Sequence, residues 1–225
     1  MRLMTREKLI NAQNISIQFF KAIEENNLIV AGKSEEQLNA EVCELALKKF
    51  GIEKHWHKKI VRSGKNTLAI YPDNPPNRLI ENDDILFIDL GPIVDNYEAD
   101  IGRTYVLGND AQKLKLKRDV EKAWYEIKEW VQPQTTLKAS ELFQYVVDKT
   151  REYGWEFGGE IAGHIVGKYP HEQPADPTSL ELDIHPENHN DIFLPDAEGN
   201  QRHWILELQF VDKENEIGGY FEQLL

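Results

Sequence analysis

Residues 84–107 read DILFIDLGPIVDNYEADIGRTYVL, and this stretch decides the fold. Apart from two aspartates, residues 84–90 are apolar, which is typical of a buried strand. Gly, Pro, Asp and Asn gather in residues 91–96, where we expect a turn. Residues 97–107 are rich in aromatic and β-branched side chains, so the stretch predicts an antiparallel hairpin.

Two aspartates in this hairpin are the first candidate site residues. Asp89 lies in the apolar strand, where an unpaired carboxylate is costly to bury, and Asp100 lies in the partner strand. A hairpin can place both on one face, where two carboxylates repel unless they share a proton or a cation. A divalent metal would satisfy both. The alternative is that one aspartate serves the turn and the other pairs with Arg103.

Four stretches have helical periodicity, and two of them look alike. Ser34–Gly51 begins with a capping box and ends at a glycine, and Thr136–Gly154 has a similar length and also ends at a glycine. Both lead into strand-like sequence, which hints at an internal duplication, although helix spacing alone favours coincidence. The other two predicted helices cover residues 5–26 and 113–131.

The remaining segments complete a single domain. We predict short strands at residues 60–64, 204–211 and 219–225. Residues 170–200 contain five prolines and little periodicity, so we expect a long loop, which is often functional or mobile. No linker divides the chain, and we expect residues 1–225 to form one α+β domain.

Composition restricts the partners. The 225 residues are 40% apolar and 29% charged, as in ordinary globular proteins, and the net charge is −13. So acidic a chain is poorly suited to bind nucleic acid or an anionic membrane surface. The lone cysteine, Cys43, fits a reducing compartment and is expected to be a buried, inert thiol. Residues 1–10 have no apolar run, so we expect no signal peptide or membrane span, and a cytoplasmic protein.

Four further residues add to the candidate site. His164 is flanked by glycines that permit close backbone approach, and His171 follows it. Glu207 and Glu222 are acids within apolar strands. A lone histidine is more often a core residue, and one buried glutamate can be a structural ion pair. Four such acids with an imidazole instead suit Mn²⁺, Fe²⁺, Co²⁺ or Zn²⁺.

The order of these residues resembles the M24 metallopeptidase family, which includes methionine aminopeptidases, aminopeptidase P, prolidase and creatinase. Residues 97–105, YEADIGRTY, look like the aminopeptidase P and prolidase branch, in which Arg-Thr follows the second aspartate. The resemblance covers residues 34–225. It implies the pita-bread fold, in which two pseudo-symmetric helix–strand halves surround a curved antiparallel sheet, in line with the suspected duplication.

The resemblance also implies a set of metal ligands. Asp89 would chelate one of two divalent ions, which could be Mn²⁺, Co²⁺, Fe²⁺ or Zn²⁺. Asp100 and Glu222 would bridge both ions, and His164 and Glu207 would complete the second site. A water molecule between the ions would become a hydroxide near neutral pH.

Three more roles follow from the same resemblance. Glu207 would accept the water proton and pass it to the leaving amine. His171 would hydrogen-bond the substrate carbonyl or the oxyanion. Arg103 would orient a carboxylate, although a surface ion pair with Glu98 is an alternative.

The chain departs from the family pattern in three places. Residues 63–71 read SGKNTLAIY, so Ile70, beside Tyr71, stands where the family has a histidine that contacts substrate. Residues 207–209 read Glu-Leu-Gln in place of Glu-Pro-Gly. We also expect the chain to lack the large N-terminal domain of aminopeptidase P and prolidase. All three departures bear on Xaa-Pro specificity, and none removes a metal ligand.

The other histidines are not assigned to the site. His55 and His57 lie upstream and could enter it, but their spacing favours an exposed strand. Surface or loop positions are expected for His185, His189 and His203.

The leading functional hypothesis is a dinuclear-metal hydrolase of short peptides or amides, either an aminopeptidase or an Xaa-Pro dipeptidase. A creatinase-like C–N hydrolase and a binding module without catalysis are the alternatives, because a fold does not fix a function. Five intact ligands argue against the binding module. The expected partner is a small peptide or amide, and a homodimer is left open.

Overall fold

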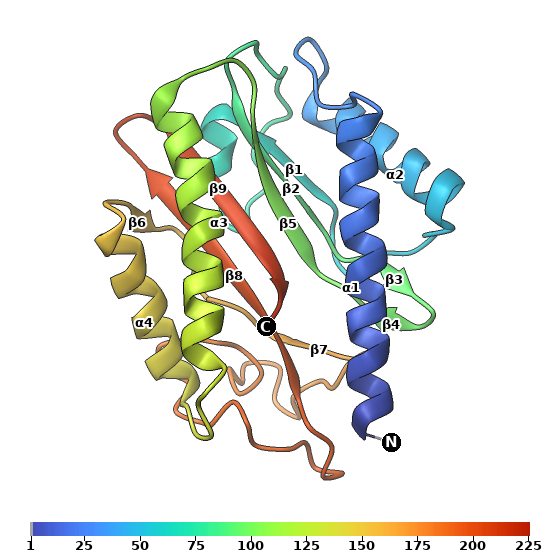
Figure 1. The fold of residues 1–225 in the computed structure, drawn as a ribbon, viewed down its shortest axis with the longest axis vertical. Helices are drawn as coiled ribbons and strands as arrows, with labels where there is room; N and C mark the ends of the chain where they lie inside the picture. The colour runs from blue at the N-terminus through green and yellow to red at the C-terminus, as the bar shows by residue number, and fades with distance from the viewer. Residues whose placement is uncertain (1) are drawn as a thin grey trace.

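The structure is a computed structural model that describes residues 2–225, with side chains described from Thr5 onward. The first half of the chain contains two helices and the predicted hairpin (Figure 1). Its elements are α1 (Arg2–Glu25), α2 (Glu35–Phe50), β1 (Ile60–Ser63), the short 3₁₀ helix η1 (Gly64–Leu68), β2 (Ile85–Leu90), β3 (Ile93–Val94), β4 (Tyr97–Glu98) and β5 (Ile101–Val106).

The second half repeats this plan. Two helices again precede a short strand and a long hairpin. Its elements are α3 (Ala111–Val131), α4 (Ala139–Glu152), β6 (Glu156–Phe157), β7 (Ile165–Val166), β8 (His203–Asp212) and β9 (Ile217–Leu224).

The main sheet makes the duplication visible. Its strand order is β1-β2-β5-β9-β8-β6, with β7 paired to β8. Each half therefore supplies a hairpin, β2–β5 or β8–β9, with a short strand at the outer edge. The two hairpins meet where β5 pairs with β9. The two halves therefore occupy the sheet symmetrically, which supports the internal duplication suspected from the two similar helices.

Two hydrophobic clusters follow the two halves. One packs α3 and α4 against β8 and β9 around Trp124 and Phe210. The other packs α1 and α2 against β2 and β5 around Phe19 and Ile88. Along β8, alternate residues such as Leu206 and Leu208 enter the first cluster, so the residues between them point to the other face.

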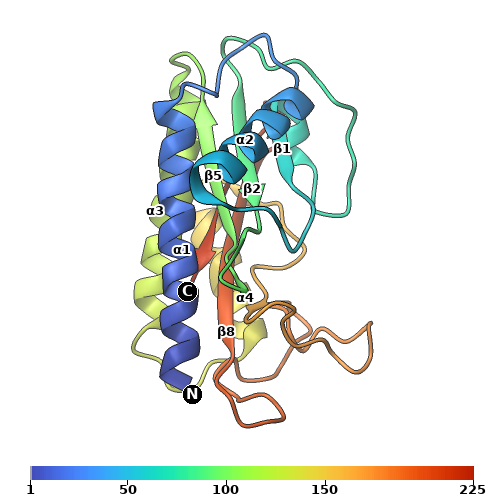
Figure 2. The same cartoon turned by 90° about the vertical axis from the view of Figure 1, so that its right-hand side faces the viewer.

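That other face carries the loops. Figure 2 shows α1 and α3 on one side of the sheet, while loops near residues 70–80 and 170–200 extend on the opposite side. Residues 170–200 contain none of the helices or strands of the described chain, as predicted. None of the described helices is long and apolar enough to cross a membrane.

Two predicted boundaries were wrong. Residues 97–98 do not continue the long hairpin, because β4 pairs with β3 to form a separate small hairpin inside the region predicted as a turn. The fourth helix begins at Ala139 rather than Thr136, since the Lys138 N–H is bound by the Glu141 side chain and the helix starts after it. The other predicted helices and strands are confirmed to within a few residues.

Candidate metal centre

Strand register places three of the predicted acids in one row. Asp89 lies opposite Gly102, Gly102 opposite Glu222, and Glu222 opposite Glu207, on four adjacent strands. Directly opposed residues of antiparallel strands point to the same face, so the three carboxylates share the face that carries the loops. Gly102 has no side chain, which leaves space between Asp89 and Glu222.

The other two predicted ligands reach the row from positions directly before a strand. Asp100 precedes β5 and His164 precedes β7. The Nε2 atom of His164 lies 3.3 Å from Asp100 Oδ2 and 3.8 Å from Glu222 Oε1. Its Nδ1 bonds the Ile165 carbonyl at 2.9 Å, which directs Nε2 toward the carboxylates.

A glycine allows His164 to reach this position. The Ile205 N–H donates to the His164 carbonyl at 2.8 Å, holding the segment against β8. At Gly163, φ is 144°, and a Cβ there would lie 2.0 Å from the Ile205 carbonyl oxygen. Only glycine tolerates this conformation and this approach.

The donor atoms fit divalent cations. Among the described side chains, Asp89 Oδ1 and Glu222 Oε2 are buried without a hydrogen-bond partner. Two groups each gather their ligand atoms within 4.8 Å, and these groups are His57, Asp89 and Asp100, and Asp100, His164 and Glu222. A carboxylate-rich set with imidazole suits Mn²⁺, Fe²⁺, Co²⁺ and Zn²⁺. Buried carboxylates without partners need either a shared proton or such a cation.

The crowding of acids alters their proton affinity. Burial, reinforced by the Asp100 and Glu207 carboxylates, raises the pKa of Asp89 to about 7. Burial, with Asp100 and Asp89 nearby, raises the pKa of Glu222 to about 8. The pKa of Glu207 is raised well above its ordinary value by burial and by Glu222. Burial opposes the ionisation of Asp100 as well, but His57 and His164 hold its pKa below the ordinary value.

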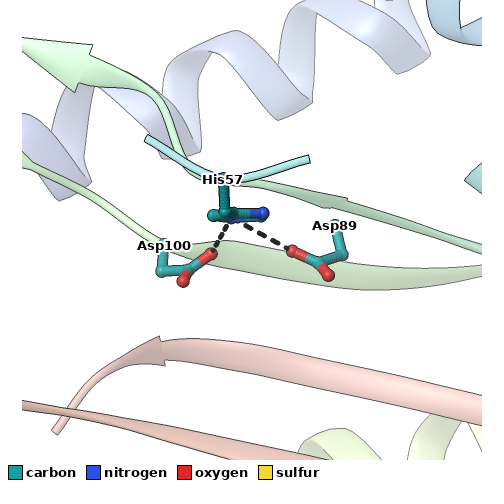
Figure 3. Close-up of side chains that lie close together, drawn as sticks. All are labelled: His57, Asp89 and Asp100. Atoms are coloured by element: carbon teal, nitrogen blue, oxygen red, sulfur yellow. Dashed lines mark hydrogen bonds and ion pairs between the residues drawn. The ribbon is translucent and has the colours of Figure 1, made fainter. Parts of the chain in front are cut away.

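His57 was wrongly expected on an exposed strand. Its side chain is only 5% exposed, and its Nε2 lies 3.0 Å from Asp100 Oδ1 and 3.7 Å from Asp89 Oδ1. Figure 3 shows the ring between the two carboxylates. Burial alone would lower the pKa of His57, but the two carboxylates outweigh it and raise that pKa to about 10. His55 is half-buried.

Glu207 occupies the end of the carboxylate row. Its Oε2 accepts a hydrogen bond from the Tyr220 hydroxyl at 3.0 Å. Tyr220 stacks on Phe87, with ring centroids 5.1 Å apart. Tyr220 therefore holds Glu207 in place from the pocket side of β9. Tyr220 was not predicted from the sequence as a site residue.

His171 is held by an acid that the sequence analysis placed elsewhere. Buried Glu98 accepts the His171 backbone N–H at 3.1 Å, and its other oxygen bonds His171 Nδ1 at 2.8 Å. The same carboxylate accepts the Gly167 N–H. Trp56 packs edge-on against the His171 ring, with centroids 5.3 Å apart. These contacts fix the ring and leave Nε2 available.

Arg103 acts through the backbone rather than on a carboxylate. It follows Gly102 and so points to the helix side of the sheet, where it lies over the Phe221 ring at 3.9 Å. Its guanidinium donates to the Glu222 carbonyl at 2.8 Å and to the Gln223 side chain. The alternative ion pair with Glu98 is wrong, because Glu98 binds His171.

The segment with Ile70 and Tyr71 forms one wall of the site. Buried Arg62 donates to the Ala69 and Ile70 carbonyls, at 2.6 and 2.9 Å. The Gln209 amide donates to the Ala69 carbonyl at 3.1 Å. Gln209 stands where the family pattern Glu-Pro-Gly has its glycine. Its side chain supports the loop that carries Ile70, which also differs from the family pattern.

Most of these groups face one pocket. Its volume is about 410 Å³, within the range of small-ligand sites. The predicted site residues that line it are Ile70, Tyr71, Asp89, Asp100, His164, His171, Glu207 and Glu222, joined by Trp56 and His57. Arg103 is the predicted site residue that does not line it.

The structure also tests the predictions for His203, His189 and Cys43. His203 is buried in β8, so a surface position was wrong, whereas His189 is exposed. Cys43 is half-buried rather than fully buried, and its Sγ contacts Asn39 Oδ1 at 3.4 Å. Burial raises the pKa of the Cys43 thiol, in keeping with low reactivity.

Comparison with known proteins identifies the family of the chain. Residues 7–195 match the model of the family described as metallopeptidase family M24. The Xaa-Pro dipeptidase of Pyrococcus horikoshii is 35% identical over 155 residues, which are 68% of this chain and 42% of that protein. The chain thus spans about two fifths of the length of the curated relatives it matches.

Solved structures share the fold over nearly the whole chain. Prolidase from Thermococcus sibiricus matches with a TM-score of 0.74 and 23% identity, covering 97% of this chain and 55% of that one. Methionine aminopeptidase from Rickettsia prowazekii matches with a TM-score of 0.67 and 14% identity, covering 96% and 90%. These likenesses confirm the predicted α+β fold.

Proposed function

Because this chain belongs to metallopeptidase family M24 and has its pita-bread fold, we propose that it is a metal-dependent hydrolase of short peptides or amides. The proposed activity is that of an aminopeptidase or an Xaa-Pro dipeptidase. The relatives described as Xaa-Pro dipeptidases support the second option. The proposed substrate is a peptide small enough for a pocket of about 410 Å³.

One observation carries the proposal. Four carboxylates and His164 converge on the pocket face of the sheet, and two of the buried carboxylate oxygens have no partner within the described structure. Such a group needs protons or cations to neutralise its charge, and the imidazole donor favours cations. Asp89, Asp100, His164, Glu207 and Glu222 would hold two divalent ions, with Mn²⁺, Co²⁺, Fe²⁺ and Zn²⁺ as candidates.

The side chains divide the chemistry among them. The bound ions would supply charge that polarises a water molecule and the substrate carbonyl. Glu207 takes a proton from the attacking water and delivers it to the leaving amine. Glu98 holds His171 Nδ1, and His171 would hydrogen-bond the substrate carbonyl oxygen through Nε2.

The test is an activity screen with defined metal content. Metal-free protein would be reconstituted with Mn²⁺, Co²⁺ or Zn²⁺ and assayed against dipeptides and tripeptides, including Xaa-Pro sequences. We expect close to two ions per chain and metal-dependent cleavage. Asp100→Ala should lose both ions, because Asp100 belongs to both ligand groups. Absence of metal binding by the reconstituted wild type would overturn the proposal.

A creatinase-like C–N hydrolase is the second candidate, and Ile70 is the observation that favours it. Ile70 lines the pocket where the family pattern has a polar, substrate-contacting histidine. If Ile70 marks a changed substrate, Ile70→His should gain activity on ordinary aminopeptidase substrates. If neither protein cleaves any peptide while two ions are bound, the second candidate replaces the first.

Three broader expectations accompany this proposal. We expect residues 1–225 to act as a single catalytic domain. The main sheet runs through both halves of the chain, which supports this expectation. The lone Cys43 favours a reducing compartment such as the cytoplasm. A homodimer can be tested by light scattering of the purified protein.

A further inference from the structure

His57 and His164 are arranged in the same way around Asp100. The Nε2 of His57 faces Asp100 Oδ1 at 3.0 Å, and the Nε2 of His164 faces Asp100 Oδ2 at 3.3 Å. Each ring also approaches a second acid, since His57 lies 3.7 Å from Asp89 and His164 lies 3.8 Å from Glu222. Asp100 thus has one imidazole on each side.

The hydrogen bonds of both rings select the same tautomer. His57 Nδ1 lies 2.7 Å from the Lys58 carbonyl, and His164 Nδ1 lies 2.9 Å from the Ile165 carbonyl. A carbonyl only accepts, so Nδ1 carries the hydrogen in both rings. Each ring, once its Nε2 proton is lost, directs the Nε2 lone pair at the carboxylates. Donation of the other ring N–H to a backbone carbonyl is characteristic of metal-bound histidine.

The backbone around His57 is fixed to hold the ring there. The Trp56 N–H donates to the Gly91 carbonyl at 2.9 Å, and the Trp56 indole N–H donates to the Ala99 carbonyl at 3.0 Å. A Cβ at Gly91 would lie 2.2 Å from His57 Cδ2, so this glycine makes room for the ring. Both partners of Trp56 belong to the segment between the two aspartates, and His57 is thereby tied to its neighbours.

We propose that His57 is a ligand of the first metal ion, beside Asp89 and Asp100, so that each ion of the centre has one imidazole. Figure 3 shows this group. The inference rests on the metal centre of the proposed function. It adds a sixth protein ligand from the segment before β1, which the resemblance to the family did not include.

A second imidazole also changes which metals the centre prefers. Imidazole suits Zn²⁺, Fe²⁺ and similar ions, whereas all-oxygen sites suit Mn²⁺ and Mg²⁺. The His57 site should therefore favour Co²⁺ or Zn²⁺ over Mn²⁺. The His57→Gln protein should lose this preference at the same site.

The experiment compares cobalt binding by three full-length proteins, wild type, His57→Gln and His55→Gln. The His55 substitution is the matched control, because it changes a half-buried histidine in the same segment that is outside both ligand groups. Calorimetric titration with Co²⁺ gives two affinities. Proton NMR of the Co²⁺ protein gives strongly shifted, exchangeable N–H signals, one for each bound imidazole.

We expect two ions and two shifted N–H signals in the wild type and in His55→Gln. In His57→Gln one affinity should fall by more than about 100-fold, beyond the usual loss for a group that only orients a ligand. One N–H signal should disappear. Unchanged affinities and two signals in His57→Gln would make His57 a counter-ion only and overturn the inference. An equal loss in His55→Gln would overturn it too.

The two proposals fail in different ways. A wild type that binds no Co²⁺ would overturn the metal-dependent hydrolase and the His57 ligand together. A wild type that binds two ions, beside a His57→Gln protein that also binds both with full affinity, overturns the His57 assignment alone.

Discussion

Glu207 differs from the other candidate ligands because Tyr220 holds it at the end of the row. If it transfers protons, Glu207→Gln should lower kcat by about 10²- to 10⁴-fold on the best substrate found. The amide keeps an oxygen ligand, so at least one ion should stay bound, as measured by elemental analysis. Glu156→Gln, an exposed acid paired with Lys213, is the control and should retain full activity. Full activity in Glu207→Gln would exclude this role.

Glu98 is a positioning residue for His171. Glu98→Gln weakens the two hydrogen bonds that fix the His171 backbone and ring, together with the bond from the Gly167 N–H. We expect kcat to fall, by less than the ~10²-fold expected for His171→Ala, with a smaller effect on KM. Steady-state kinetics would show this. Glu172→Gln, which weakens the nearby pair with Arg202, should leave kcat unchanged. The same kinetics in both variants would contradict the assignment.

Only some of the candidate site residues could be predicted from the sequence. Asp89, Glu207 and Glu222 could be proposed because an acid in an apolar strand demands an explanation. His57 could not, because its role depends on a turn that folds back over Gly91. The role of Glu98 was also predicted wrongly. Glu98 lies beside His171 because of the path of the long loop, and the sequence of that loop has no periodicity from which the path could be predicted.

Helix α2 supports the pocket wall through its first residue. Buried Glu35 accepts hydrogen bonds from the Ser63 N–H, the Ser63 hydroxyl and the Asn66 amide. These residues lead into the loop that carries Ile70. The capping box at Ser34 fixes the start of this helix and thus the place of Glu35.

Glu35→Ala should therefore destabilise the protein and loosen the pocket. Leaving buried donors without a partner costs about 1–3 kcal/mol for each group, so we expect a loss of at least ~2 kcal/mol in urea unfolding. KM should rise as the loop loses its support. Exposed Glu36, one residue further, provides the control, and Glu36→Ala should stay within about 0.5 kcal/mol of the wild type. Equal stability of the two variants would contradict this role.

Elements were predicted better than their connections. The apolar runs of β2, β8 and β9 and the periodicity of the helices identify them without tertiary information. The β3–β4 hairpin escaped because two-residue strands carry too little pattern to distinguish from a turn. The pairing of β5 with β9 joins residues far apart in the chain, and only the resemblance to a family suggested it.

Metal should stabilise the whole protein. The carboxylates repel one another without cations, and a ligand at about one hundred times its Kd adds roughly 2.7 kcal/mol to stability. Chelation should lower the Tm, and Mn²⁺ or Co²⁺ should restore it in a scanning calorimeter. The Asp100→Ala protein should show little change with either treatment. An unchanged wild-type Tm after confirmed metal loss would contradict the metal centre.

The metal-free protein should become less stable as pH rises. The folded-state pKa values of Asp89, Glu222 and His57, about 7, 8 and 10, all exceed the ordinary values of 3.8, 4.5 and 6.5. The folded state therefore binds more protons between about pH 4 and pH 10, and stability falls across that range. Asp100 has the opposite sign but acts only below its ordinary pKa of 3.8.

We expect the Tm of metal-free protein to be higher at pH 5.5 than at pH 8.5. Bound metal should reduce this slope, because the ions replace the protons among the carboxylates. Thermal denaturation at both pH values, with and without Co²⁺, measures the difference. A metal-free Tm that rises toward pH 8.5 would show that the carboxylates are not crowded as the structure places them.

The pairing of β5 with β9 also affects how the protein unfolds. Each half has its own hydrophobic cluster, and the register between the hairpins has a single aligned pair, Gly102 with Glu222. The first half supplies Asp89 and Asp100, and the second supplies His164, Glu207 and Glu222. Bound ions would thus act as a removable cross-link between the two halves, in addition to the bonds of Gln209 to Ala69 and of Arg103 to Glu222. Removing the ions should broaden the unfolding transition, because fewer interactions then couple the two halves.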